Sequence, residues 1–492
     1  MKYLSTRDKE KSVSAAEAIA QGLSDEGGLF LPESIPLLEQ AELESLLKMH
    51  YRDRAVFIMG KFLDEFSKEE LLSFVKQAYS ENYDDESIAP THFLNDSTGF
   101  LELWHGPTCA FKDMALQMLP LLLTASLKKI GEQRKVCILV ATSGDTGKAA
   151  LEGFADVSGT SIVVFYPRDG VSDVQKLQMT TQRGENVLVC AVEGNFDDTQ
   201  TGVKEIFGDK DFAEKLNEKS IFLSSANSIN WGRLLPQIVY YFSSYCDYVN
   251  SGRIKMGDEI DFCVPTGNFG DILAGWYAKK MGLPIRRLIC ASNSNNVLTD
   301  FIKTGVYDRN RKFFTTISPS MDILVSSNLE RLLFMLSDDS AVKGWMEELK
   351  TTGKYEVGEK VLSAIAADFD CGFATDEEAK LCIKKVFDTE GYLMDTHTAD
   401  AFVVLEKLRR EKGETFPTVI VSTASPYKFC DSVLESLGQK SDLSGAKLIN
   451  ALEEASGTKA PLPLCGLDGK RPRFSDCIAK EDMSKAVFNF LS

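Results

Sequence analysis

The chain has 492 residues, of which 44% are hydrophobic and 26% are charged, so it is long enough to bury the cores of two or three domains. Its formal net charge of −17 argues against nucleic acid as a main partner, because a phosphate backbone requires a basic surface. The four histidines lack the spacings typical of zinc ligands, and the eleven cysteines include no CxxC pair, so we expect no metal site and a reducing compartment.

The first 92 residues are rich in helical patterns, and the stretch DEGGLFLPESIP supplies a Gly-Gly turn and a proline-containing corner. We predict a separate N-terminal domain there. The longest apolar stretch, around MLPLLLTASL, is too short to cross a bilayer, and the beginning of the chain lacks the apolar core of a signal peptide. The sequence therefore predicts a cytoplasmic protein with no membrane partner.

From about residue 135 to 295, short apolar runs alternate with helical patterns, which is typical of an α/β fold. Each run is continuously apolar, as expected for a strand whose two faces are both covered by helices. The predicted strands lie at 136–142, 161–167, 186–192, 221–226, 260–266 and 286–292, and a further strand lies at 418–425. We therefore expect parallel sheets, one of which is completed late in the sequence.

The turn after the strand at 136–142, in ATSGDTGKAA, offers hydroxyl and backbone N–H groups at the start of a helix. Its Gly-Lys pair does not complete a P-loop, because Thr142 stands where glycine is required and Ala149 where a hydroxyl is required. A nucleotide triphosphatase is therefore disfavoured. Ser143, Asp145 and Thr146 suit a carboxylate or phosphate ligand, and they equally suit an ordinary helix cap.

Two further strands end in turns of similar character. In VPTGNFGDILAGW, Gly267 and Gly270 allow successive backbone N–H groups to converge on one anion at the positive end of a helix. A phosphate fits there, although a plain left-handed turn has the same pattern. In STASPYKF, three hydroxyl residues either cap a helix or hydrogen-bond a heterocyclic nitrogen.

A single lysine, Lys112, lies in HGPTCAFKDMALQ between a Gly-Pro turn and an apolar helical run. An apolar flank favours desolvation, which lowers the pKa of an amine from its usual value of about 10.4 and makes the amine nucleophilic. Pyridoxal 5′-phosphate would use all of these features, because it carries an aldehyde, a phosphate and a ring nitrogen. The same pattern also permits a lysine with a buried stem and an amine that reaches water.

These segments, together with SINWGRLLPQ, ASNSNNVLTDF and SPSMDI, resemble in order and spacing the motifs of the threonine synthase family. The opening stretch also resembles that family's N-terminal region, so the resemblance runs from about residue 3 to 435. It implies an α/β, fold-type II pyridoxal-phosphate architecture like that of the tryptophan synthase β chain. The domains then expected are an N-terminal domain at 1–92, a large cofactor-binding domain at 93–128 and 229–450, a small domain at 129–228 and a C-terminal tail at 451–492.

The resemblance also implies roles for individual residues. Lys112 matches the family's Schiff-base lysine, and Thr423 matches the hydroxyl that faces the pyridine nitrogen. The cofactor phosphate loop matches Gly267, Asn268, Phe269, Gly270 and Asp271. The segment 143–147 matches the loop that meets the substrate, with Asp145 where many relatives in the wider fold carry asparagine. The family pattern also favours proline in place of Thr396 and often histidine in place of Ser425.

The activity that the resemblance implies is the conversion of O-phospho-L-homoserine and water to L-threonine and phosphate, in which Lys112 also carries protons. Because the substrate and the cofactor are anionic, an acidic protein must concentrate positive potential in its cleft. The candidate substrate-binding residues are Ser143, Asp145, Thr146, Arg233 and Lys428, and Lys148 and Arg7 are further candidate cations. We expect a monomer or a homodimer.

Two alternatives stay open at this point. A related phospholyase would eliminate phosphate from another amino-alcohol phosphate without forming threonine, and it would share many of these motifs. A noncatalytic binding protein of the same fold is disfavoured, because Lys112 occurs together with both anion-binding turns.

Overall fold

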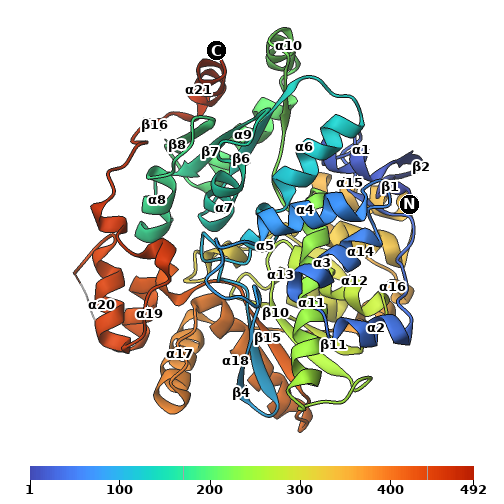
Figure 1. Ribbon diagram of the computed structural model, residues 1–492, viewed down its shortest axis with the longest axis vertical. Coiled ribbons are helices and arrows are strands. Elements are labelled where there is room, and N and C mark those ends of the chain that lie inside the picture. The colour runs from blue at the N-terminus through green and yellow to red at the C-terminus, as the bar shows by residue number, and fades with distance from the viewer. Residues whose placement is uncertain (170, 440–441) are drawn as a thin grey trace.

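The chain folds around two parallel β-sheets, the larger in the lower half of Figure 1 and the smaller in the upper half. The structure is a computed structural model that describes residues 1–169, 171–439 and 442–492. The larger sheet has the order β14-β11-β10-β15-β5-β4, in which β4 pairs antiparallel with β5 and the other pairs are parallel. Its strands are β4 (Thr91–Asn95), β5 (Thr98–Glu102), β10 (Ile260–Pro265), β11 (Ile285–Ser292), β14 (Phe369–Phe373) and β15 (Thr418–Ser422).

The smaller sheet is parallel throughout and has the order β16-β8-β7-β6-β9. Its strands are β6 (Lys135–Ala141), β7 (Thr160–Pro167), β8 (Val187–Val192), β9 (Ile221–Ser224) and β16 (Cys477–Ile478). Each of the seven strands predicted from apolar runs is present, and the late strand β15 lies between β10 and β5 as a member of the larger sheet. The predicted α/β class is therefore confirmed.

Helices cover these sheets, and they begin where strands end. On the smaller sheet they are α7 (Asp145–Phe154), α8 (Asp173–Thr180), α9 (Phe196–Gly208) and α10 (Lys210–Glu218). With the larger sheet they are α5 (Asp113–Leu116), α6 (Leu119–Lys129), α11 (Trp231–Asn250), α12 (Gly270–Lys280), α13 (Val297–Thr304) and α18 (Thr396–Lys412). Short 3₁₀ turns lie at η1 (Pro319–Met321) and η2 (Pro426–Lys428).

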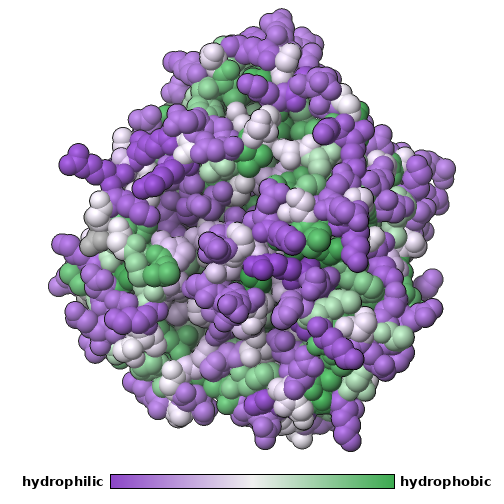
Figure 2. Space-filling view, in the orientation of Figure 1, coloured by the Kyte–Doolittle hydropathy of each residue, from purple (hydrophilic) through white to green (hydrophobic). Residues whose placement is uncertain are grey.

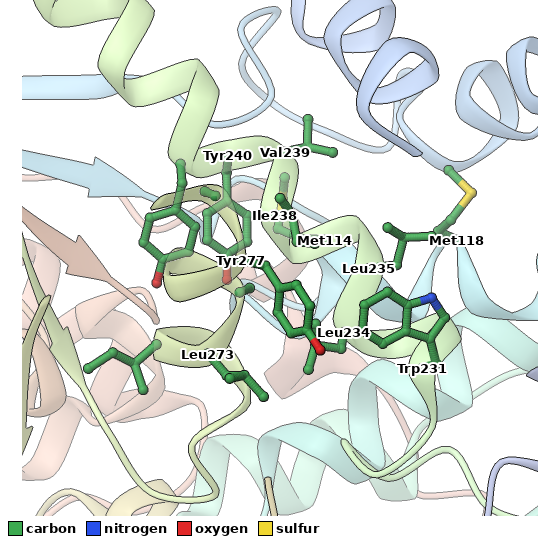
Figure 3. Packing of buried hydrophobic residues seen from close by; sticks show 14 of the residues in the cluster. Met114, Met118, Trp231, Leu234, Leu235, Ile238, Val239, Tyr240, Leu273 and Tyr277 are labelled. Carbon is green, nitrogen blue, oxygen red and sulfur yellow. The ribbon is translucent and has the colours of Figure 1, made fainter. Parts of the chain in front are cut away.

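The long helix α11 forms the centre of the main hydrophobic core. Nearly all of its residues are buried, which is the expected position for a helix that is apolar on every side. Figure 3 shows Trp231, Leu234 and Ile238 of this helix packed near Leu273 and Tyr277 of α12. Because α12 begins at the predicted phosphate loop, this packing fixes the position of that loop.

The N-terminal part contains a small antiparallel sheet and four helices. They are β1 (Tyr3–Ser5), β2 (Asp8–Val13), β3 (Phe30–Pro32), α1 (Ala15–Gln21), α2 (Gln40–Leu46), α3 (Tyr51–Gly60) and α4 (Lys68–Ala78). This part shares its core with the rest of the chain, since the rings of Tyr3 and Phe62 pack against Trp231 at centroid distances of 5.6 and 5.7 Å. The predicted limits of the domains stay a prediction.

The stretch 329–390 is mostly helical, and it also supplies strand β14 to the larger sheet. Its helices are α14 (Leu329–Leu336), α15 (Asp339–Thr351), α16 (Glu359–Asp368) and α17 (Asp376–Glu390), and β12 (Val306–Asp308) pairs with β13 (Lys354–Glu356). The C-terminal segment runs through α19 (Cys430–Ser436) and α20 (Lys447–Ser456) and then reaches the smaller sheet with β16 and α21 (Met483–Phe490). Figure 1 shows this end of the chain, in red, beside α9.

Polar side chains cover most of the face seen in Figure 2, and apolar ones are scattered among them. In the described part of the chain, no helix combines the length and the apolar character that a membrane span requires. All eleven cysteines are free thiols, and nine of them are buried. They pack as small hydrophobic residues, which agrees with their position in apolar sequence runs.

Candidate active site

A cavity of about 360 Å³ lies at the carboxyl ends of β6, β10 and β15, so it is bordered by both sheets. Ligands of open α/β sheets bind at such ends. The main lining segments are residues 141–146, 265–271 and 319–325, and α11 adds further side chains. Turns that are far apart in the sequence therefore meet at one cavity, as the strand-to-helix pattern predicts.

Lys112 lies immediately before α5 and lines the cavity, with a side chain that is 7% exposed. Its Nζ donates to Asp145 Oδ2 at 3.3 Å and to Ser320 Oγ at 3.1 Å, and it lies 4.5 Å from the ring centroid of Phe111. Burial lowers the pKa of this amine, and Asp145 offsets only part of that effect, so the pKa lies below its usual value. A nucleophilic lysine requires such an environment.

The loop that joins β10 to α12 presents backbone N–H groups to the same cavity. Phe269 has a φ of +60°, a left-handed conformation that is uncommon for a residue with a side chain. No side chain caps α12, and no described residue accepts a hydrogen bond from the N–H groups of 268–271. A Cβ atom on Gly267 would lie 2.5 Å from the carbonyl oxygen of Ser320, so this position requires glycine. The helix start is therefore open to an anion.

Asp271 belongs to this predicted loop, but its carboxylate is turned toward α11. Its Oδ1 accepts hydrogen bonds from Tyr240 at 2.6 Å and Tyr241 at 2.8 Å. Burial raises the pKa of the Asp271 carboxyl to about 6, although both tyrosines and Lys112 act in the opposite direction. These contacts anchor the first turn of α12 to α11, so we assign the side chain to positioning the loop.

Thr423 follows β15 and lines the cavity on another side. Its backbone carbonyl accepts a hydrogen bond from Phe111 N at 2.8 Å, which ties the residue to the segment that carries Lys112. Among the residues described by the structure, none forms a hydrogen bond with the Thr423 hydroxyl, so this group is free to bond a ligand.

The turn before α7 brings Ser143, Asp145 and Thr146 to the cavity. The hydroxyl of Thr142 accepts hydrogen bonds from the N–H groups of Gly144 and Gly147 at 3.0 and 2.9 Å, so the chain itself caps part of this helix start. The capping hydroxyl is thus that of Thr142, which the sequence reasoning did not single out as a cap, while Ser143 and Thr146 line the cavity.

Arg233, at the start of α11, is the cavity's strongest anion-binding candidate. Its side chain is buried, and Nη1 donates to the carbonyl of Ala226 at 2.9 Å. Nη2 approaches the hydroxyl of Thr146 at 3.5 Å. No carboxylate in the described ranges pairs with it, and burial alone lowers the pKa of its guanidinium to about 10. A buried cation without an acidic partner favours binding of an anion.

The other predicted cations lie elsewhere. Lys428 is fully buried and is not part of the cavity lining, because its amine binds Asp145 and the carbonyl of Thr108. Lys148 forms an ion pair with Glu152 at 2.7 Å. Arg7 forms one with Glu330 at 2.8 Å. Local sequence does not reveal the pairings of Lys428 and Arg7, because their partners are hundreds of residues away, whereas Lys148 and Glu152 are four residues apart.

Ser320 and His397 are cavity residues that the sequence reasoning missed as individual site residues. The N–H of Ser320 donates to His397 Nε2 at 3.1 Å, which positions the Ser320 hydroxyl beside Lys112. The segment is also clamped at Asp322, whose carboxylate accepts hydrogen bonds from Asn293 at 2.7 Å and Asn295 at 2.9 Å. The sequence feature that could have identified these residues is the SPSMDI motif together with the asparagine-rich ASNSNN. The structure brings the two segments into contact through Asp322 and its two asparagine partners.

The two departures from the family pattern have structural roles outside the cavity lining. Thr396 is buried, and its hydroxyl donates to the carbonyl of Ile317 at 2.8 Å. Ser425 is buried, and its hydroxyl accepts a hydrogen bond from Tyr427 N at 3.3 Å as the cap of η2. Neither substitution removes a group from the cavity wall.

These features fit pyridoxal phosphate at three separate positions. The cavity contains an amine with a lowered pKa, an uncapped helix N-terminus and a free hydroxyl. They suit the aldehyde, the phosphate and the ring nitrogen of the cofactor respectively. Lys112, residues 267–271 and Thr423 are the groups that would hold it.

Three family models match the chain. They are "Threonine synthase N terminus" over residues 2–79, "Pyridoxal-phosphate dependent enzyme" over residues 100–425 and "Threonine synthase, C-terminal" over residues 398–487. The second match alone covers more than half of the chain, and it includes every cavity segment named above.

Similar proteins carry the same family names. The chain is 42% identical to human threonine synthase-like 1, over 88% of this chain and 60% of that protein's length. It is 40% identical to the threonine synthase of Saccharomyces cerevisiae, over 90% of this chain and 91% of the yeast protein. The solved yeast structure matches with a TM-score of 0.89 at 36% identity, covering 100% of this chain and 98% of that one.

A pyridoxal-phosphate-bound threonine synthase from Brucella melitensis matches with a TM-score of 0.87 at 37% identity, covering 100% of this chain and 98% of that chain. Likeness of this extent, together with the match to the yeast protein over nearly its whole length, places the chain in the threonine synthase family of fold-type II, pyridoxal-phosphate-dependent enzymes.

Proposed function

We propose that the chain is a threonine synthase, which converts O-phospho-L-homoserine and water into L-threonine and phosphate with pyridoxal 5′-phosphate as its cofactor. The observation that carries this proposal is the convergence of Lys112, the open start of α12 and the unpaired Arg233 on one cavity. The reaction needs one covalent anchor and places for two phosphate groups, and these three features supply them.

Each residue then has a defined task. Lys112 would hold the cofactor covalently, and its amine, when free, would carry protons among the α, β and γ carbons of the substrate. The N–H groups of 268–271 would hold the cofactor phosphate, and the Thr423 hydroxyl would bond the ring nitrogen. When bound, pyridoxal phosphate supplies an acceptor for the electron pair released at the substrate carbon.

The substrate phosphate lies against Arg233, with Ser143 and Thr146 as hydroxyl donors. Arg233 is suited to this because its guanidinium is buried and has only neutral partners. A phosphate that departs beside an immobile cation leaves more readily, since the cation stabilises the developing charge. Lys204 of α9 also lines the cavity, but it is exposed and its Nζ approaches Gln200 Oε1 at 3.4 Å, so Arg233 is the better-positioned cation.

The proposal is tested by the ultraviolet–visible spectrum of the purified protein before and after addition of O-phospho-L-homoserine, with threonine and phosphate both quantified. We expect a visible band from lysine-linked cofactor, a spectral change with substrate, and threonine and phosphate in equal amounts. A protein that retains the cofactor but forms no threonine would reject the proposal.

A second candidate is a phospholyase that releases phosphate from a related amino-alcohol phosphate. It is kept because the chain is 42% identical to human threonine synthase-like 1, whose name states likeness to threonine synthase and not that activity. The two candidates share the anchor and both phosphate positions, and they differ in whether water is added at the β carbon. Phosphate released without threonine therefore identifies the second candidate.

The proposal also covers the cellular compartment and the oligomeric state. We infer a cytoplasmic protein, because all of its cysteines are free thiols. It acts on a small molecule, without nucleic acid as a partner, as a monomer or a homodimer. Light scattering on the purified protein distinguishes these two states.

A further inference from the structure

Lys428 and Asp145 form a fully buried ion pair directly behind Lys112. The distance from Lys428 Nζ to Asp145 Oδ1 is 2.9 Å, and the two side chains are 0% and 1% exposed. Lys428 ends η2, which follows β15 of the larger sheet, whereas Asp145 begins α7, which follows β6 of the smaller sheet. The pair therefore joins the two sheets at the cavity.

The contacts of Asp145 give its carboxylate one orientation. Oδ1 accepts hydrogen bonds from Lys428 and, at 2.7 Å, from Gln175 Nε2. Oδ2 is directed to Lys112 Nζ at 3.3 Å. Lys428 is held from its other side by the carbonyl of Thr108 at 2.7 Å. Lys428 is not part of the cavity lining, whereas Asp145, which it contacts, is.

The ion pair with Lys428 balances the charge of the buried Asp145 carboxylate. A charge that is buried without a partner is strongly destabilising, whereas a hydrogen-bonded pair avoids that cost. Lys112 cannot be the permanent partner of Asp145, because the proposed reaction links it to the cofactor and then frees it again. Lys428 takes no part in that exchange, so it remains as the constant counter-ion.

We propose that Lys428 is a positioning residue that acts through Asp145, keeping this carboxylate ionised and its Oδ2 directed at the Lys112 amine throughout the reaction. The buried pair is then a neutral unit beside the amine of Lys112. The inference rests on the proposed function only in its use of Lys112 as the amine that reacts with the cofactor.

The effect on Lys112 has a definite sign. The charged groups that act on this amine are Asp145 on α7, Arg233 on α11 and Lys428 in η2, and Asp271 on α12 lies within electrostatic range. Asp145 raises the pKa of Lys112, whereas Arg233 and Lys428 lower it. Without Lys428, Lys112 is the remaining lysine that pairs with the Asp145 carboxylate and the repulsion from Lys428 is lost, so the pKa of Lys112 rises and the neutral fraction of its amine at pH 7 falls. Removing Asp145 has the opposite effect.

The test compares Lys428→Met, Asp145→Asn and the double variant with the natural protein. Two quantities are measured: the pH dependence of Lys112 acetylation in cofactor-free protein, by mass spectrometry, and the rate at which the visible band appears after pyridoxal phosphate is added. We expect Lys428→Met to slow formation of the band about tenfold at pH 7, which corresponds to about one unit in the pKa of Lys112. The double variant should recover most of this loss.

Lys148→Met is the matched control. Lys148 is also largely buried, and it pairs with Glu152 on α7, the helix that carries Asp145, but it does not line the cavity. This variant should leave Lys112 acetylation unchanged. If Lys428→Met does not fold, as judged by circular dichroism, Asp145→Asn and the double variant give the same contrast.

An unaltered Lys112 titration in Lys428→Met, or a double variant no better than the more damaged single variant, overturns the proposal. Both measurements are independent of turnover. A protein that shows the expected pKa shifts and yet forms no threonine contradicts the proposed function and leaves the role of Lys428 intact.

Discussion

The starts of α7 and α12 border the same cavity, but they are built in different ways. At α12 the backbone N–H groups of 268–271 have no acceptor in the described part of the chain, so the backbone itself offers an anion site. At α7 the Thr142 hydroxyl already binds two N–H groups, and the chemistry comes from side chains, chiefly Asp145 with its partner Lys428. The comparison indicates that the permanent cofactor phosphate belongs at the backbone site, whereas the transient substrate belongs near the side chains.

The largest effect is expected at Lys112, because both turns serve this amine. Lys112→Ala should abolish the visible band and lower activity by about 10⁴-fold or more, since a nucleophile and a proton carrier are lost together. The measurement is the absorbance spectrum and turnover of the purified variant. Retained turnover would show that another amine reacts with the cofactor, and the starts of α7 and α12 would then not act on Lys112.

Arg233→Met tests whether the α7 side of the cavity binds the substrate phosphate. We expect kcat/KM to fall roughly a hundredfold, corresponding to about 3 kcal/mol for a lost buried charge contact, with little change in cofactor affinity. Arg233→Lys should recover part of the activity. An equal loss of cofactor affinity would indicate that Arg233 binds the cofactor instead.

Two glycine variants test whether the loop before α12 binds the cofactor. A Cβ at Gly267 would lie 2.5 Å from a backbone oxygen, whereas at Gly270 its nearest neighbour is a side-chain atom at 3.4 Å. Gly267→Ala should therefore weaken cofactor binding about tenfold through a strain of about 1–3 kcal/mol, and Gly270→Ala should change it little. Equilibrium titration with pyridoxal phosphate measures both. Equal effects would mean that the clash is not what shapes the loop.

The smallest effect is expected at Thr423. Thr423→Val removes one hydroxyl of nearly unchanged shape, so cofactor affinity should fall about fivefold, as expected for about 1 kcal/mol from one hydrogen bond. Thr423→Ser keeps the hydroxyl and should bind like the natural protein. If serine and valine variants bind equally well, the hydroxyl does not contact the cofactor.

The backbone site was more accessible to sequence reasoning than the side-chain site. A strand followed by TGNFGD predicts a turn and a helix start from local residues alone, and the structure has both, while the convergence of the N–H groups on an anion stays a prediction. The seven apolar runs likewise predicted the strands, because continuous apolar character is a local property of a doubly covered strand.

The side-chain site depends on partners that are distant in sequence. Lys428 was expected to meet the substrate, whereas the structure places it behind Asp145, 283 residues earlier in the chain. Ser320 was missed because its position comes from His397 and from the Asn293–Asp322 contact. The tail strand β16 was also missed, since two residues carry no periodic signal and their pairing with β8 depends on the completed fold.

The central claim is that one amine and one helix start hold pyridoxal phosphate from opposite ends. A crystal structure of the protein with bound cofactor tests it most directly. We predict continuous density from Lys112 Nζ to the cofactor, with the phosphate against the N–H groups of 268–271. Density joined to another lysine, or a cofactor phosphate seated at the start of α7, would contradict the account.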